Sequence, residues 1–211
     1  MMIKRIVKFV GAFLAVETGL YPCIYFIIDR RFGLLHSKSD AVLSSLWWNI
    51  GFYSHIIPGG LALLIGWLQF NSRLRKNHLK VHRLVGRTYV ISALISSLAA
   101  IYIAFYARGG IIATLGFVSL GIVWFSTTLK AYLLIRSRRV DDHQKMMVFS
   151  YAACFAAVTL RIYLPLLDRI FRDEITAYLV VSWLCWIPNI IVAFILTRRL
   201  PPSTSPYPAS S

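Results

Sequence analysis

Residues 111–135 read IIATLGFVSLGIVWFSTTLKAYLLI and contain one charged side chain, Lys130. A membrane-spanning α-helix needs about 20 consecutive apolar residues, so this stretch is long enough to cross a bilayer. Similar apolar runs occur on both sides of it. The six predicted spans are residues 6–28, 46–70, 88–107, 111–135, 146–167 and 175–197. The sequence therefore predicts an all-α integral membrane protein, folded as a six-transmembrane-helix bundle.

The composition of the whole chain agrees with this prediction. Hydrophobic residues make up 58% of the 211 residues and charged residues 15%, whereas about a quarter of the residues in an ordinary soluble domain are charged. Six spans leave no room for a separate water-soluble catalytic domain. We expect one membrane domain over residues 1–200 and a disordered tail, PPSTSPYPASS, over residues 201–211.

The distribution of basic residues predicts how the chain is oriented. Basic loops stay preferentially on the cytoplasmic side of a membrane. With the amino terminus inside, fifteen of the 23 Lys and Arg residues fall in inner segments and six in outer segments. Both termini are therefore predicted to be cytoplasmic. Membrane orientation then explains the net charge of +15 without a nucleic-acid partner. The charge also implies attraction to anionic lipid of the inner leaflet.

Three ionisable side chains inside the predicted spans form a first candidate site, because burying such groups in lipid is costly. Glu17 lies near the middle of the first span, while His55 and Arg161 reach similar depths from opposite ends of theirs. An ion pair between Glu17 and Arg161 would lower the cost of both charges, and His55 could hydrogen-bond nearby. The cluster could hold a ligand, although pairing between helices would also account for it.

A second candidate site lies at the predicted inner face. If the third span begins early, His82 and Gly86 share one helical stripe, because positions four apart align. This pattern suits a flat, anionic cofactor such as haem b, with an imidazole as axial ligand and a glycine that leaves space for the ring edge. Arg83 and Arg87 would pair with its carboxylates. His143, at the start of the fifth span, is the candidate second ligand.

Two other interpretations of His82 and His143 stay open. Neutral histidines together with an aspartate could hold a transition metal. Alternatively, basic loops that contain histidine at the cytoplasmic boundary are common topology determinants and need no ligand.

Four segments of the chain resemble a bacterial family of predicted multi-pass membrane proteins of unknown function. They are HIIPGGLALLIGWLQF (55–70), HRLVGRTYV (82–90), DDHQKMM (141–147) and TLRIYLPLL (159–167). The resemblance covers about residues 46–167 and implies a multi-pass protein of the bacterial inner membrane. It also implies which residues to test first, namely those in its motifs: His55, His82, Arg83, Arg87, His143 and Arg161.

The chain is also distantly similar to transmembrane b-type cytochromes of the ascorbate-reducible and ferric-reductase kind, in which paired histidines hold haem. His82 and His143 match one such pair, whereas His55 has no histidine counterpart on the fourth span. This similarity implies at most one haem.

Three functions are compatible with these features, and whether the chain is an enzyme is left open. The first is a haem-binding redox protein that exchanges electrons with quinone or a partner subunit. The second is a transporter or small-molecule binding protein that uses the cluster of Glu17, His55 and Arg161. The third is a non-catalytic subunit or assembly factor of a membrane complex.

Overall fold

The computed structural model describes residues 2–27, 35, 36 and 38–200, and every regular element within them is a helix. Six stretches are long and apolar enough to cross a membrane: Phe9–Ile27, Leu46–Phe70, Leu79–Ala104, Gly110–Arg136, Val140–Phe171 and Glu174–Arg198. In their most apolar windows only 22–39% of the residues are buried, and apolar surface of this extent is suited to lipid rather than water. The prediction of an all-α protein with six membrane-spanning helices is confirmed. The tail predicted for residues 201–211 lies outside the described residues.

The chain divides into two compact units, residues 1–103 and 104–211. The elements of the first unit are α1 (Met2–Leu20), η1 (Tyr21–Cys23), α2 (Ile24–Ile27), α3 (Asp40–Ser44), α4 (Leu46–Gly66), η3 (Trp67–Phe70), α5 (Ser72–Asn77) and α6 (Leu79–Ala104). The third span was predicted to begin at residue 88, but α6 begins at Leu79. His82 and Gly86 therefore do share one helix.

Helix α1 packs against α4 through two glycines. A Cβ atom on Gly60 would lie 2.6 Å from the backbone oxygen of Gly19, and one on Gly19 would lie 2.9 Å from the oxygen of Gly60. The backbones approach this closely only because neither residue has a side chain, an arrangement that is frequent between membrane helices.

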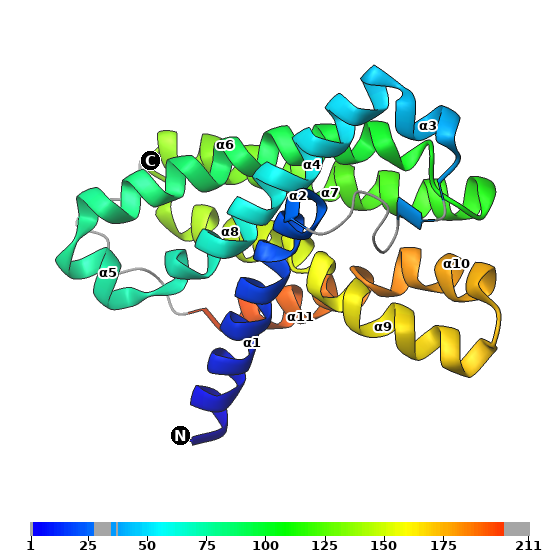
Figure 1. Ribbon diagram of the computed structural model, residues 1–211. Coiled ribbons are helices and arrows are strands. Elements are labelled where there is room, and N and C mark those ends of the chain that lie inside the picture. The colour runs from blue at the N-terminus through cyan, green and yellow to red at the C-terminus, as the bar shows by residue number, and fades with distance from the viewer. Residues whose placement is uncertain (1, 28–34, 37, 201–211) are drawn as a thin grey trace. The chain divides into compact units, whose positions relative to one another are not determined.

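Helices α4 and α6 pack antiparallel, with α5 at the turn between them (Figure 1). Gly51 faces the ring of Tyr102 near one end of the pair. His55 contacts Ser96 further along, and Gln69 contacts His82 at the other end. The residue numbers rise along one helix as they fall along the other, as two successive membrane spans joined by a short turn require.

The second unit contains α7 (Gly110–Arg136), α8 (Val140–Cys154), α9 (Ala156–Phe171), α10 (Glu174–Leu184) and α11 (Ile187–Arg198). Helix α8 packs on α7 and α11, and α10 packs on α7 and α9 (Figure 1). At the turn before α7, Gly109 and Gly110 adopt φ angles of 85° and 68°. Glycine reaches this left-handed region without the steric cost that a side chain would bring.

The fifth and sixth spans are both interrupted near their middles. Helix α8 ends at Cys154 and α9 begins at Ala156, with Phe155 between them. Helix α10 ends at Leu184 and α11 begins at Ile187, after Cys185 and Trp186. Continuous spans were predicted for both segments.

Candidate functional site

His55 joins two membrane spans of the first unit. Its Nδ1 lies 3.1 Å from the backbone oxygen and 3.0 Å from the hydroxyl of Ser96. In the tautomer with the proton on Nδ1, the ring donates to that backbone oxygen, which can only accept. The Ser96 hydroxyl, which is fully buried, donates to the backbone oxygen of His55 at 2.7 Å. These two residues therefore join α4 to α6 through more than one polar contact.

Glu17 and Arg161 have different surroundings. Glu17 lies on α1 with an exposed side chain, and it makes no hydrogen bond or ion pair with any residue that the structure describes. Arg161 lies on α9 of the second unit, and its Nη1 donates to the backbone oxygen of Ala157 at 2.9 Å. Glu17 and His55 belong to one unit and Arg161 to the other, so the three-residue cluster stays a prediction.

The space beside His82 is occupied. A Cβ atom on Gly86 would lie 3.0 Å from the Oε1 of Gln69, and the Nε2 of Gln69 lies 3.4 Å from the backbone oxygen of His82. The glycine was expected to leave space for the edge of a flat ring, but it accommodates the buried side chain of Gln69 instead. Arg83 and Arg87 are exposed one helical turn apart on the same helix.

His143 is held by the neighbouring span of the second unit. Its Nδ1 donates to the backbone oxygen of Ala131 on α7 at 2.8 Å. If the imidazole is neutral, Nε2 then carries the free lone pair. Histidines that bind metals are commonly held in this way, with the other ring nitrogen donating to a carbonyl or carboxylate. The nearby Asp142 forms an ion pair with Arg139, and the Nη2 of Arg139 lies 2.5 Å from the Oδ2 of Asp142. His82 lies in the first unit and His143 in the second, so their pairing stays a prediction.

A buried polar joint connects the interrupted spans of the second unit. The side-chain amide of Asn189 on α11 lies 3.3 Å from the backbone oxygen of Ala152, 3.1 Å from the hydroxyl of Thr159 and 3.1 Å from the backbone oxygen of Cys185. The Thr159 hydroxyl in turn donates to the oxygen of Cys185. Interrupting a helix frees carbonyl groups, and these side chains bind two of them.

Sequence reasoning did not single out this joint. Thr159 and Asn189 stand in runs that were assigned to spans on their apolar character, and the residues at the interruptions are apolar as well. The available signal was Asn189 itself, because an asparagine inside a span needs hydrogen-bond partners from other helices. Pro188 beside it was a second signal, since proline favours the start of a helix.

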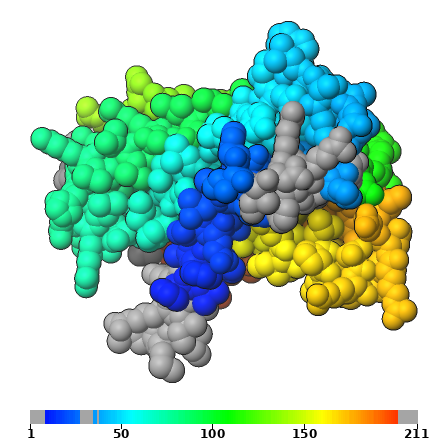
Figure 2. Space-filling view, in the orientation of Figure 1, coloured from blue at the N-terminus to red at the C-terminus, as the bar shows by residue number. Residues whose placement is uncertain are grey.

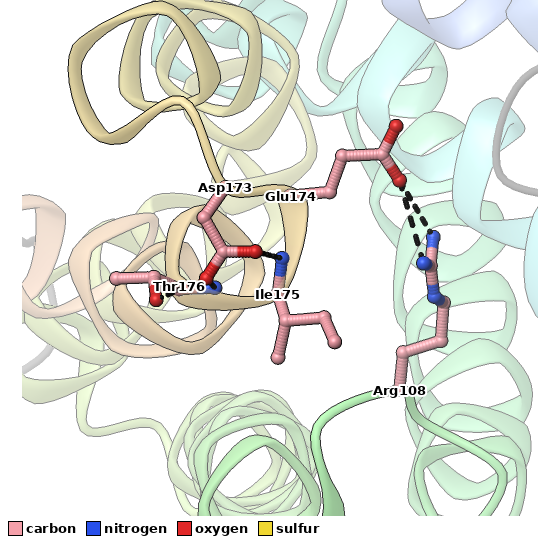
Figure 3. A network of polar contacts seen from close by, with 5 residues as sticks. All are labelled: Arg108, Asp173, Glu174, Ile175 and Thr176. Carbon is pink, nitrogen blue, oxygen red and sulfur yellow. Dashed lines mark hydrogen bonds and ion pairs between the residues drawn. The ribbon is translucent and has the colours of Figure 1, made fainter.

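Polar contacts of another kind hold the end of the second unit where α7 and α10 begin (Figure 3). The guanidinium of Arg108 lies 3.4 Å from the Oε2 of Glu174. Asp173 caps α10 by accepting from the backbone nitrogens of Ile175 and Thr176 and from the Thr176 hydroxyl. These hydrogen bonds lower the pKa of Asp173 below its ordinary value, and the bond from the Thr176 hydroxyl has the largest effect.

Within residues 2–27, 35, 36 and 38–200, no group of three or more His, Cys, Asp or Glu side chains is placed to hold a metal ion. The described geometry instead defines an integral membrane protein with six helical spans, of which the last two are interrupted around a polar joint.

A family model described as "Predicted membrane protein (DUF2306)" matches residues 52–197, which is most of the chain. The chain belongs to this family of membrane proteins, which confirms the resemblance to multi-pass membrane proteins of unknown function. No curated protein and no solved structure matches it.

Proposed function

We propose that the protein binds or transports a small molecule within the membrane, and that the polar joint of the second unit is its site. One observation carries the proposal: two spans are interrupted near their middles, and the interruptions meet at Asn189. In membrane transporters, substrate and ion sites are typically formed by discontinuous helices near the bilayer midplane. Irregular backbone at that depth is tolerated where it is buried in protein or lines a cavity.

The chemistry of the joint indicates the kind of ligand. The groups gathered there are the backbone oxygens of Ala152 and Cys185 and the hydroxyl of Thr159, all of which accept hydrogen bonds. The amide of Asn189 binds them now. A ligand that donates hydrogen bonds could replace this amide, so we propose a small, polar, uncharged or cationic molecule rather than an anion.

The proposal is tested by the access of water to Cys185, which is fully buried at the interruption. Cys23 and Cys154 are changed to Ser, and the reaction of Cys185 with a charged, water-soluble methanethiosulfonate is followed in membranes. A site that opens gives labelling. The matched control places the thiol further along the same span, at the equally buried Ala193 of α11, in a Cys185→Ser background. If Cys185 is labelled no faster than a cysteine at position 193, the joint is purely structural and the proposal is overturned.

Haem-mediated electron transfer is the second candidate, and one observation favours it. The hydrogen bond from His143 to Ala131 orients an imidazole as a haem-binding site would. The Gln69 side chain over Gly86 argues against a ring at the other proposed ligand, His82. An absorption spectrum of the purified protein decides between these observations. A Soret band that shifts on reduction with dithionite and is lost in His143→Ala supports haem b, and a colourless folded protein excludes it.

We also propose that the membrane is a bacterial inner membrane, with both termini in the cytoplasm. The excess of Lys and Arg in alternate connecting segments supports this orientation. Cysteines placed singly at Ser72 and at Gly110 should then be labelled by an impermeant reagent from opposite sides. Labelling of both from one side contradicts the orientation.

A further inference from the structure

Six cations are concentrated in residues 71–87, which comprise α5 and the first turns of α6 and which we term the basic turn. All six side chains are exposed: Arg73, Arg75, Lys76, Lys80, Arg83 and Arg87. The turn contains no carboxylate, and the sequence has no Asp or Glu at all between Asp40 and Asp141. Local sequence therefore supplies nothing to neutralise this charge.

The structure supplies no partner either. None of the six side chains makes a hydrogen bond, ion pair or ring contact with a residue that the structure describes. In Figure 2 the basic turn appears in blue-green with long side chains projecting from it. An anion that binds these cations must come from outside the described residues.

The corresponding turn of the second unit, between α7 and α8, provides an internal comparison. There the guanidinium of Arg136 donates to the hydroxyl of Tyr132 at 3.1 Å, and Arg139 pairs with Asp142. Both turns are rich in arginine, but only this second turn binds its arginines within the fold. Orientation in the membrane requires positive charge in either turn and does not account for the difference.

The position of the basic turn identifies its environment. It connects the spans Leu46–Phe70 and Leu79–Ala104, so it lies where the chain leaves and re-enters the bilayer. Apolar side chains are exposed next to the cations, with Phe70 just before the basic turn at 45% exposure and Leu84 within it at 66%. Long basic side chains beside exposed apolar ones can reach phosphate groups while the apolar ones contact acyl chains.

We propose that the basic turn binds the headgroups of anionic phospholipids. Arginine is well suited to phosphate because its planar guanidinium can donate two parallel hydrogen bonds. Lys80, Arg83 and Arg87 follow one another at spacings of three and four along α6, so they form a single stripe that faces the lipid headgroups. Arg73, Arg75 and Lys76 on α5 supply a second group of cations.

The test is native mass spectrometry of the purified full chain in a neutral detergent. It is titrated with phosphatidylglycerol and, separately, with phosphatidylcholine carrying the same acyl chains. The wild-type chain should bind the anionic lipid selectively. Each cation near a membrane surface contributes attraction worth about a five-fold change in affinity. Replacing Lys80, Arg83 and Arg87 together by Gln should therefore weaken phosphatidylglycerol binding by roughly 100-fold, with little effect on phosphatidylcholine.

The matched control removes the same charge from the other turn, by replacing Arg136, Arg138 and Arg139 with Gln. It should change phosphatidylglycerol binding by less than about five-fold. Equal losses in the two triple variants, or no preference for phosphatidylglycerol over phosphatidylcholine, overturn the proposal. Displacement of the lipid by millimolar inorganic phosphate also overturns it, because the site then recognises a free anion. Should the first triple variant fail to fold, Arg83→Gln alone must still weaken binding by about five-fold.

Discussion

The two units join neighbouring membrane spans by the same device but treat the middle of the membrane differently. In each unit a histidine donates from Nδ1 to a backbone oxygen of the adjacent helix, His55 to Ser96 in the first and His143 to Ala131 in the second. In the first unit α6 continues unbroken through its middle, and α4 is one continuous helix although Pro58 lies inside it. In the second unit two spans are interrupted, and side-chain amides and hydroxyls bind the freed carbonyls.

This difference indicates which spans can change conformation in their middles. A continuous helix without proline, such as α6, satisfies its backbone hydrogen bonds internally, so its middle has no alternative partner in lipid. An interrupted span depends on a few side chains, and another donor could replace them. The same asymmetry extends to the two compared turns, because Arg136 and Arg139 have partners among the described residues of the second unit and the cations of the basic turn have none among the described residues.

The largest expected effect is on the close packing of the first unit. Gly60→Ala places a Cβ atom 2.6 Å from the backbone oxygen of Gly19, so α1 and α4 must separate, and we expect a loss of about 2–3 kcal/mol in stability. Gly11→Ala is the control, because nothing lies within 4 Å of a Cβ atom there. Thermal unfolding in detergent measures both. Equal midpoints for the two variants contradict the proposed packing.

Asn189→Leu removes the central side chain of the polar joint in the second unit. The change leaves the backbone oxygens of Ala152 and Cys185 without the amide that binds them, and we expect a loss of about 1–3 kcal/mol. Thr197→Val on the same helix removes a hydroxyl that bonds only to its own helix, at Phe194, and should cost clearly less, because such bonds back to the helix add little stability. The difference between the two thermal midpoints is the test, and a stable Asn189→Leu protein shows that the joint is dispensable.

A smaller effect is expected for the hydroxyl pair that links the continuous α7 to α8. The Oγ1 of Thr128 lies 2.6 Å from the Oγ of Ser150, and both side chains are fully buried. A double-mutant cycle with Thr128→Val and Ser150→Ala should give a coupling of about 0.6 kcal/mol, a typical value between membrane helices. Thr128 also bonds to Trp124 within α7, so the single changes need not be equal. A coupling of zero would show that the two hydroxyls do not interact.

The smallest effect concerns pH at the exposed start of α10. Because hydrogen bonds lower the pKa of Asp173 in the fold, its cap contributes fully above about pH 4, the ordinary pKa of an aspartate. The contribution fades as the pH falls through the lowered value. Asp173→Asn keeps a capping oxygen that does not titrate. Between pH 7 and pH 3 the wild-type thermal midpoint should fall further than that of the variant, and parallel decreases contradict the role of the cap.

The sequence predicted the spans because each contains an apolar run of sufficient length. It missed the beginning of α6 at Leu79 because Lys80, Arg83 and Arg87 interrupt the hydropathy, although the helix continues past the apolar region. The interruptions at Phe155 and Cys185 were not predicted because apolar residues stand there, and nothing in their periodicity distinguishes a broken helix from an intact one.

The candidate sites show a similar limit. His55 was proposed to act beside Glu17 and Arg161, and His143 to bind a cofactor. In the structure each contacts a backbone oxygen of the neighbouring helix, and such a partner has no signature in a sequence. Gly86 was interpreted as space for a cofactor, whereas Gln69, seventeen positions earlier, fills that space. Residue type indicated where polar partners were required, and only the packing of the helices showed which partners they were.

Hydrogen–deuterium exchange of the full chain in lipid nanodiscs compares the middles of the two units most directly. If the interruptions are the mobile part of the protein, the amides of residues 152–158 and 184–190 exchange faster than those of residues 92–100 in the middle of α6. Equal protection of these three segments would contradict the account, because the joint would then be as rigid as an unbroken helix.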